Sequence, residues 1–122
     1  MIIDHITLLV RDFQRSRQFY LQVLAPLGIG ISTEFEGVAG LGRNGKGELW
    51  LRGSDQPQTP LHLAFLAENR QQVDAFHAAA LAAGARDNGA PGVRTIYHPH
   101  YYAAFVTDPD GHNIEAVCHA PA

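Results

Sequence analysis

The sequence predicts an α+β fold of two tandem βαβββ modules, which form a curved mixed sheet around a cleft with the helices on the outer face. Two observations lead to this prediction. In each half of the chain, a short apolar strand pattern is followed by a helical pattern and then by several short strands. The two halves also begin alike, because His5 and His62 each open a strand of alternating apolar residues.

The chain of 122 residues is predicted to be a single domain, with module one at 1–52 and module two at 61–119. The linker at 53–60 is polar and rich in turn-forming residues. Hydrophobic residues make up 46% of the chain, which is enough for a buried core. Cys118 is the single cysteine, so an internal disulfide is excluded.

Charge and hydropathy exclude two classes of partner. A formal net charge of −3 gives no basic surface for nucleic acid, and no stretch approaches the roughly 20 apolar residues that span a bilayer. The first residues do not have the basic start of a signal peptide. We therefore expect a cytoplasmic protein without a nucleic-acid or membrane partner.

Module one opens with a strand predicted at 2–10, where Ile, Leu and Val are frequent. Asp12 is placed to cap the following helix, and Gly28 is placed to end it. The apolar stripe of that helix consists of Ser16, Phe19, Tyr20, Val23, Leu24 and Leu27. Short strands are then predicted at 29–36, 38–43 and 47–52, with Asn44-Gly45 as a turn signal.

Module two repeats this order, beginning with a strand predicted at 61–66. Asn69, with Gln72 three residues later, is a capping signal for the second helix, and Gly84 is placed to end that helix. Its apolar stripe consists of Val73, Phe76, Ala80 and Leu81. Further strands are predicted at 93–97, 101–107 and 112–118, with turns at 88–92 and 108–111.

Alternation along the strands predicts which side chains face the cleft. The apolar neighbours of His5 and His62 should pack on the helices, which turns both imidazoles toward the cleft. If a four-residue loop joins the last two strands, Thr107 pairs with His112. In this register Glu115 also faces the cleft with Tyr102 nearby, and Phe105 packs beneath the helix.

Two imidazoles and one carboxylate on one surface are a set of ligands suited to a divalent metal. His5, His62 and Glu115 match the set that holds Fe(II) with open positions for substrate. Mn, Co, Ni and Zn are also candidates, because affinity alone discriminates poorly between these ions.

Several short motifs resemble one known family. The chain carries DHITL at 4–8, FY at 19–20, PLHLAF at 60–65, FV at 105–106, DPDG at 108–111 and NIE at 113–115. It resembles members of the vicinal oxygen chelate superfamily, which includes glyoxalase I, extradiol dioxygenases and the fosfomycin- and bleomycin-resistance proteins. The resemblance implies metal ligands on the first and last strands of the modules, at positions matched by His5, His62 and Glu115.

The resemblance leaves a fourth ligand open. Glu48 is the nearest candidate on the last strand of module one. If Glu48 faces the cleft, four protein ligands resemble those of glyoxalase I. If Leu49 faces it instead, the three-ligand set resembles that of the dioxygenases, and we favour this second reading slightly.

The resemblance implies a divalent-metal-dependent enzyme, similar to either lactoylglutathione lyase or an extradiol dioxygenase. Its expected partner is a small-molecule substrate, an oxygenated compound that is chelated through neighbouring oxygens. Glu115 and Tyr102 are the candidate catalytic residues. His98, His100 and Tyr102 are candidate substrate contacts, joined by Trp50 if its ring faces the cleft rather than the helix. The alternative is a metal-free binding protein of the bleomycin-resistance type. By analogy with the family we expect a homodimer, in which the modules of two chains can share the ligands.

Overall fold

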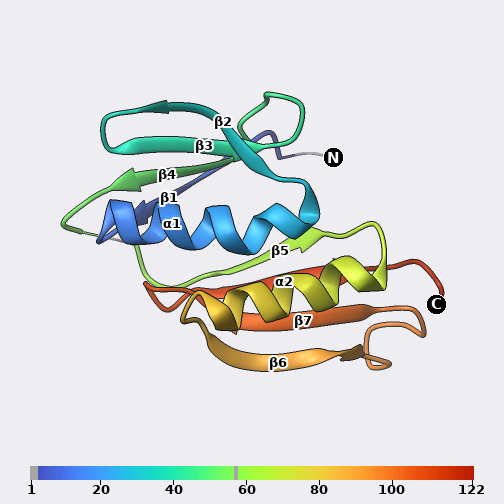
Figure 1. Ribbon diagram of the computed structural model, residues 1–122. Coiled ribbons are helices and arrows are strands. Elements are labelled where there is room, and N and C mark those ends of the chain that lie inside the picture. Colours follow the sequence, from blue (N-terminus) through green and yellow to red (C-terminus); the bar gives the residue numbers. More distant parts are fainter. Residues whose placement is uncertain (1–2, 57) are drawn as a thin grey trace.

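The computed structural model describes residues 3–56 and 58–122, and it confirms two βαβββ modules (Figure 1). Module one contains β1 (Ile6–Val10), α1 (Phe13–Leu24), the short 3₁₀ helix η1 (Ala25–Leu27), β2 (Gly30–Phe35), β3 (Val38–Gly42) and β4 (Leu49–Gly53). Module two contains β5 (His62–Leu66), α2 (Arg70–Ala82), β6 (Arg86–Val93), β7 (Tyr102–Thr107) and β8 (Asn113–Cys118).

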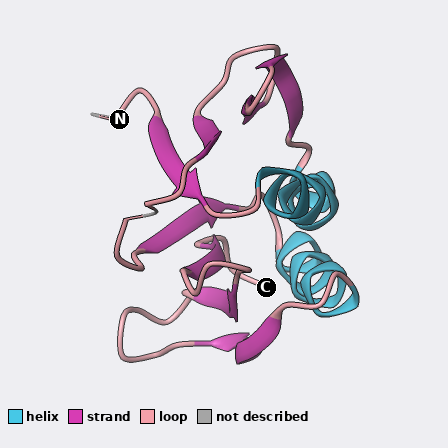
Figure 2. Cartoon of the chain, turned by 90° about the vertical axis from the view of Figure 1, so that its left-hand side faces the viewer, coloured by secondary structure: helices cyan, strands magenta, loops and turns pink. Residues whose placement is uncertain are grey.

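Each module forms a four-stranded mixed sheet, with the strand orders β1-β4-β3-β2 and β5-β8-β7-β6. In both sheets the first and last strands of the module pair in parallel, and the other pairs are antiparallel. The two helices lie on the same side of the sheets and pack against each other (Figure 2). We call the opposite side the helix-free face. None of the described helices is long and apolar enough to cross a membrane.

The core lies between the sheets and the helices, as strand alternation predicts. Leu8 and Val10 of β1 are fully buried, whereas Thr7, the residue before Leu8, is exposed. The predicted stripe of α1 is buried throughout, and the Asp12 side chain accepts a hydrogen bond from the Arg15 backbone N–H as the predicted cap.

Helix α1 also ties the two modules together. The Tyr20 hydroxyl donates to the carboxylate of Asp108, and the Ser16 hydroxyl donates to Asp110 at 3.4 Å. Burial, together with the charge of Asp108, raises the pKa of Tyr20 well above its usual value. Tyr20 therefore stays a neutral donor that links the core of module one to the loop before β8.

Helix α2 differs from the predicted stripe at its C-terminal end. Leu81, expected in the core, is 42% exposed, and His77 is buried instead. His77 Nε2 lies 2.9 Å from Asp87 Oδ1 at the start of β6. This polar contact, rather than the predicted packing of Leu81, holds the C-terminal half of α2 on the sheet.

Strand β6 lies where a turn was predicted. The sequence placed a turn at 88–92 and a strand at 93–97, but the strand runs over Arg86–Val93. Its pairing with β7 shifts twice, on either side of Gly89. Because β6 is an edge strand, it tolerates Pro91 and these irregularities, which hide the alternating pattern in the sequence.

The predicted register of β7 and β8 is wrong by one residue. Thr107 pairs with Asn113, not with His112, because the connecting loop has one residue more than expected. The Asp108 carboxylate closes this loop by accepting from the backbone N–H groups of Asp110 and His112, at 3.0 and 2.8 Å. The shift turns Phe105, which was expected beneath the helix, to the helix-free face beside Glu115.

Candidate functional site

The centre of the site is a contact between β5 and β8 on the helix-free face. His62 Nε2 lies 2.7 Å from Glu115 Oε1. The parallel register places Glu115 beside Ala64, whose small side chain leaves room for the imidazole. Glu115 is 1% exposed, whereas the His62 side chain is 52% exposed. A buried carboxylate thus meets an imidazole that a ligand can reach from solvent.

Tyr101 holds the other oxygen of that carboxylate. Its hydroxyl donates to Glu115 Oε2 at 2.5 Å. Burial, followed by the hydrogen bond and the negative charge of Glu115, raises the pKa of Tyr101 to about 12. The phenol therefore remains protonated at neutral pH and acts as a fixed donor. Tyr101 was not among the site residues predicted from the sequence. A five-residue loop between β7 and β8, in place of the four-residue loop assumed, puts Tyr101 rather than Tyr102 on the same face as Glu115.

Tyr102 lies on the opposite side of the sheet. Its hydroxyl donates to Asp74 Oδ1 of α2 at 2.5 Å, and the Arg70 guanidinium lies 4.9 Å from the centre of its ring. The expectation that Tyr102 stands next to Glu115 is therefore wrong, and the reason is the one-residue shift of the hairpin.

Two further histidines extend the site beyond Tyr101. His98 Nδ1 accepts from the His100 backbone N–H at 3.0 Å, so in the neutral ring the proton is on Nε2. That atom faces His119 Nδ1 at 2.8 Å, and the two rings stack. The Tyr101 ring packs edge-on against both. Of the two histidines predicted to contact substrate, His98 belongs to this cluster and His100 is exposed nearby.

In module one, His5 is held by a carboxylate. Its Nδ1 lies 2.8 Å from Asp4 Oδ2, and Lys46 Nζ lies 2.9 Å from the other oxygen of Asp4. The hydrogen bond from His5, and next the contact with Lys46, lower the pKa of Asp4. With Nδ1 donating to a carboxylate, the lone pair of His5 Nε2 is left for another partner, the arrangement usual for metal-binding histidines.

Trp50 takes the place in module one that Glu115 has in module two. Thr7 pairs with Trp50 in the same way that Ala64 pairs with Glu115. The indole lies on the helix-free face against two glycines, and a Cβ at Gly40 would come within 2.7 Å of it. Neither residue considered for this place occupies it, since Leu49 is buried and Glu48 lies just before β4.

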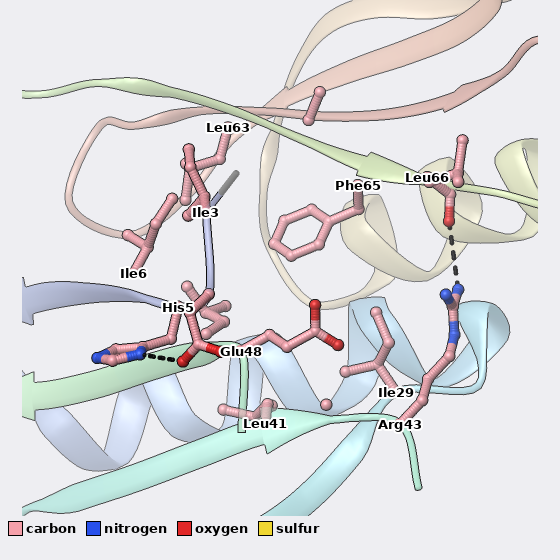
Figure 3. A pocket seen from close by; sticks show the side chains of 14 residues that line it. Ile3, His5, Ile6, Ile29, Leu41, Arg43, Glu48, Leu63, Phe65 and Leu66 are labelled. Carbon is pink, nitrogen blue, oxygen red and sulfur yellow. Dashed lines mark hydrogen bonds and ion pairs between the residues drawn. The ribbon is translucent and has the colours of Figure 1, made fainter. Parts of the chain in front are cut away.

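A separate cavity of about 310 Å³ lies between the two modules (Figure 3). Its walls are mostly apolar and include Ile6, Leu41, Leu63 and Phe65. The Glu48 side chain points into it, whereas the His5 ring points aside toward Asp4 (Figure 3). His62 and Glu115 are not among its lining residues. The apolar cavity and the His62–Glu115 pair are therefore different places.

The donor set fits a divalent metal in part. His62 and Glu115 supply one nitrogen and one oxygen, which lie at a hydrogen-bond distance of 2.7 Å and would have to separate slightly to bind a single ion. Within residues 3–56 and 58–122, no three His, Cys, Asp or Glu side chains are grouped closely enough to hold one. One chain thus offers two ligands at this point and a third, His5, in the other module.

Comparison with known proteins identifies the family. The sequence model of the Glyoxalase/Bleomycin resistance protein/Dioxygenase superfamily matches residues 2–116. A glyoxalase/bleomycin resistance protein from Albidiferax ferrireducens T118 is 31% identical, with a TM-score of 0.84 over 99% of this chain and 100% of that chain. No curated protein matches the sequence.

More distant structures share the fold. A glyoxalase/bleomycin resistance protein/dioxygenase family enzyme from Burkholderia phytofirmans PsJN is 24% identical over 96% of this chain and 98% of that chain, with a TM-score of 0.73. The oxidase ChaP-H2 is 22% identical over 99% and 94%, with a TM-score of 0.67. With a family match over nearly its whole length and a relative of the same size, the chain belongs to the Glyoxalase/Bleomycin resistance protein/Dioxygenase superfamily.

Proposed function

We propose that this protein is a divalent-metal-dependent enzyme, a lyase or a dioxygenase, that acts on a small substrate with two neighbouring oxygens. One observation carries the proposal: His62 Nε2 and Glu115 Oε1 lie 2.7 Å apart on the helix-free face. A carboxylate that is 1% exposed is costly to desolvate unless a cation or several donors compensate it. Glu115 accepts from the Tyr101 hydroxyl at Oε2, and without a cation Oε1 has only the solvent-accessible imidazole of His62 as its donor.

The proposed metal ligands are His62 and Glu115 of one chain and His5 of the partner subunit in a homodimer. A second chain is invoked because the described part of one chain brings no third ligand to the pair. His5 suits the role because Asp4 orients its ring and leaves Nε2 free. Glu48 is left out of the set, since Trp50 has the place that corresponds to Glu115.

A bound divalent cation would supply Lewis-acid stabilisation of a negatively charged substrate oxygen. The protein groups would position the reaction around it. Tyr101 fixes the Glu115 carboxylate through Oε2, so Oε1 would hold the ion and would accept a substrate proton only on leaving it. His98 and His119 support the Tyr101 ring. In the proposed dimer the partner subunit's Trp50, which lies in the same module as His5, would form an apolar wall that limits water.

Metal titration tests this proposal. Metal-free protein is mixed with Fe(II), Mn, Co, Ni or Zn, and bound metal and melting temperature are measured. An ion at a hundred times its dissociation constant should stabilise the fold by about 2.7 kcal/mol. Glu115→Gln should abolish the shift, and Glu36→Gln, which alters an exposed turn carboxylate, should retain it. The proposal fails if none of the five ions binds or raises the melting temperature.

A second candidate function is supported by the apolar cavity. Its volume of about 310 Å³ is at the lower end for small-molecule sites, and its walls suit an apolar ligand. A metal-free binding protein would use this cavity and would need no ion at His62. In the titration above, such a protein would show no metal-induced shift, and apolar compounds would stabilise it instead.

A further inference from the structure

Arg94 lies over an aromatic ring that borders the proposed site. Its guanidinium carbon is 5.3 Å from the centre of the Phe105 ring. Phe105 pairs with Glu115 across β7 and β8, so both side chains are on the helix-free face. The His62 ring lies 6.1 Å from the same phenyl ring. A positive charge and the His62–Glu115 pair therefore border the same aromatic side chain.

The position of the Arg94 guanidinium is fixed by the backbone of β6. Its two terminal nitrogens donate to the carbonyls of Gly92 and Ala90, at 2.9 and 2.7 Å. Two glycines leave the space that it fills. A Cβ at Gly89 would come within 3.2 Å of one terminal nitrogen, and a Cβ at Gly92 within 3.0 Å of the other. The irregular, glycine-rich strand thus forms a cradle for this side chain.

The charge of Arg94 has no counter-ion in the described part of the chain. None of the ion pairs there involves Arg94, although the side chain is partly buried. A guanidinium has five N–H donors, and the two carbonyls can take only some of them. A planar fork that is held in place with donors to spare suits the two oxygens of a carboxylate.

We propose that Arg94 binds a carboxylate group of the substrate, whose apolar body packs on Phe105. The inference rests on the proposed function, because it assumes that the neighbouring oxygens of the substrate are held at His62 and Glu115. It narrows the substrate class to small molecules that combine two adjacent oxygens with a separate carboxylate.

Binding of matched probes to the Mn-loaded protein tests the inference. Catechol and methylcatechol carry two adjacent oxygens, and protocatechuate adds a carboxylate to the same ring. Calorimetry should show protocatechuate binding about tenfold or more tightly than methylcatechol, as one charge-assisted contact allows. Arg94→Gln should remove this preference and leave methylcatechol binding unchanged. Arg94→Lys, which keeps the charge but not the fork, should retain part of it.

Arg86→Gln is the matched control, since Arg86 is an exposed arginine at the other end of β6, and it should keep the full preference. Circular dichroism confirms that each variant folds. Equal binding of the two compounds by the wild-type protein, or a preference that survives in Arg94→Gln, overturns the inference alone. If neither compound binds the Mn-loaded protein, the proposed function fails and the inference fails with it.

Discussion

The adjacent tyrosines before and at the start of β7 give a sharp prediction, because Tyr101 and Tyr102 serve opposite faces of one sheet. Tyr101→Phe removes the donor to Oε2 of Glu115, a carboxylate that is 1% exposed. Tyr102→Phe removes the donor to Asp74, which is exposed to water. The two substitutions delete the same atom from the same residue type and should differ in cost.

The magnitudes follow from burial. A buried acceptor that loses its donor destabilises the fold by about 1–3 kcal/mol, with more for a charged group. At about 4 °C per kcal/mol for a domain of this size, Tyr101→Phe should lower the melting temperature by roughly 4–12 °C. Water replaces the lost donor at Asp74, so Tyr102→Phe should cost less than about 1 kcal/mol.

Urea and thermal denaturation measure the stability loss in both variants. The protein is metal-free and is kept at one concentration throughout. Equal losses in the two variants, or a larger loss for Tyr102→Phe, would refute the assignment of Tyr101 to the buried carboxylate. Either result would favour the register predicted from the sequence, in which Tyr102 lies beside Glu115.

Three further predictions concern module one and the edge of module two. Asp4→Asn should weaken metal binding by about 10- to 100-fold, because the Asp4 carboxylate orients His5, the proposed metal ligand, and should cost little stability; calorimetry tests this, and unchanged affinity contradicts it. Gly40→Ala should displace the Trp50 indole and cost about 1–3 kcal/mol, because its Cβ would lie 2.7 Å from the ring; an unshifted tryptophan emission spectrum would argue against the contact. The hydrogen bond from His77, and next the backbone N–H of Gly89, lower the pKa of Asp87 below its usual 3.8, so this group stabilises the fold above that value and loses its effect as the pH falls through its lower folded pKa. Asp87→Asn should therefore lower the melting temperature at pH 7 and match the wild type in strong acid, and a loss that is independent of pH would contradict this.

Much of the fold follows from local signals in the sequence. The caps at Asp12 and Asn69 and the buried stripe of α1 were predictable, because each depends on nearest-neighbour spacing along a helix. The two opening strands were predictable from their alternating apolar residues, although β1 runs only over Ile6–Val10 and residue 2 of the predicted strand lies outside the described residues. Strand β6 was not, since its pattern is interrupted by glycines and a proline that only an edge position tolerates.

The candidate site depends on register, which a single sequence specifies poorly. One extra loop residue, stabilised by the Asp108 carboxylate, exchanged Tyr102 for Tyr101 beside Glu115. A similar count between β1 and β4 placed Trp50, rather than Glu48, opposite Thr7. The residue types at a site can be inferred from composition and from the alternation of side chains along a strand. Which face each side chain takes depends on the length of the connecting loop, and tertiary contacts such as Tyr20 with Asp108 close that loop.

The proposal that two chains share one metal site has a direct test in mixed dimers. His5→Ala and His62→Ala chains, each unable to bind metal tightly alone, are co-expressed with different tags and the heterodimer is isolated. If His5 of the partner subunit completes the His62–Glu115 pair, one of the two sites in the heterodimer keeps every ligand, and elemental analysis should find one ion per dimer. A heterodimer without metal, beside a wild-type protein that binds it, would contradict the shared site.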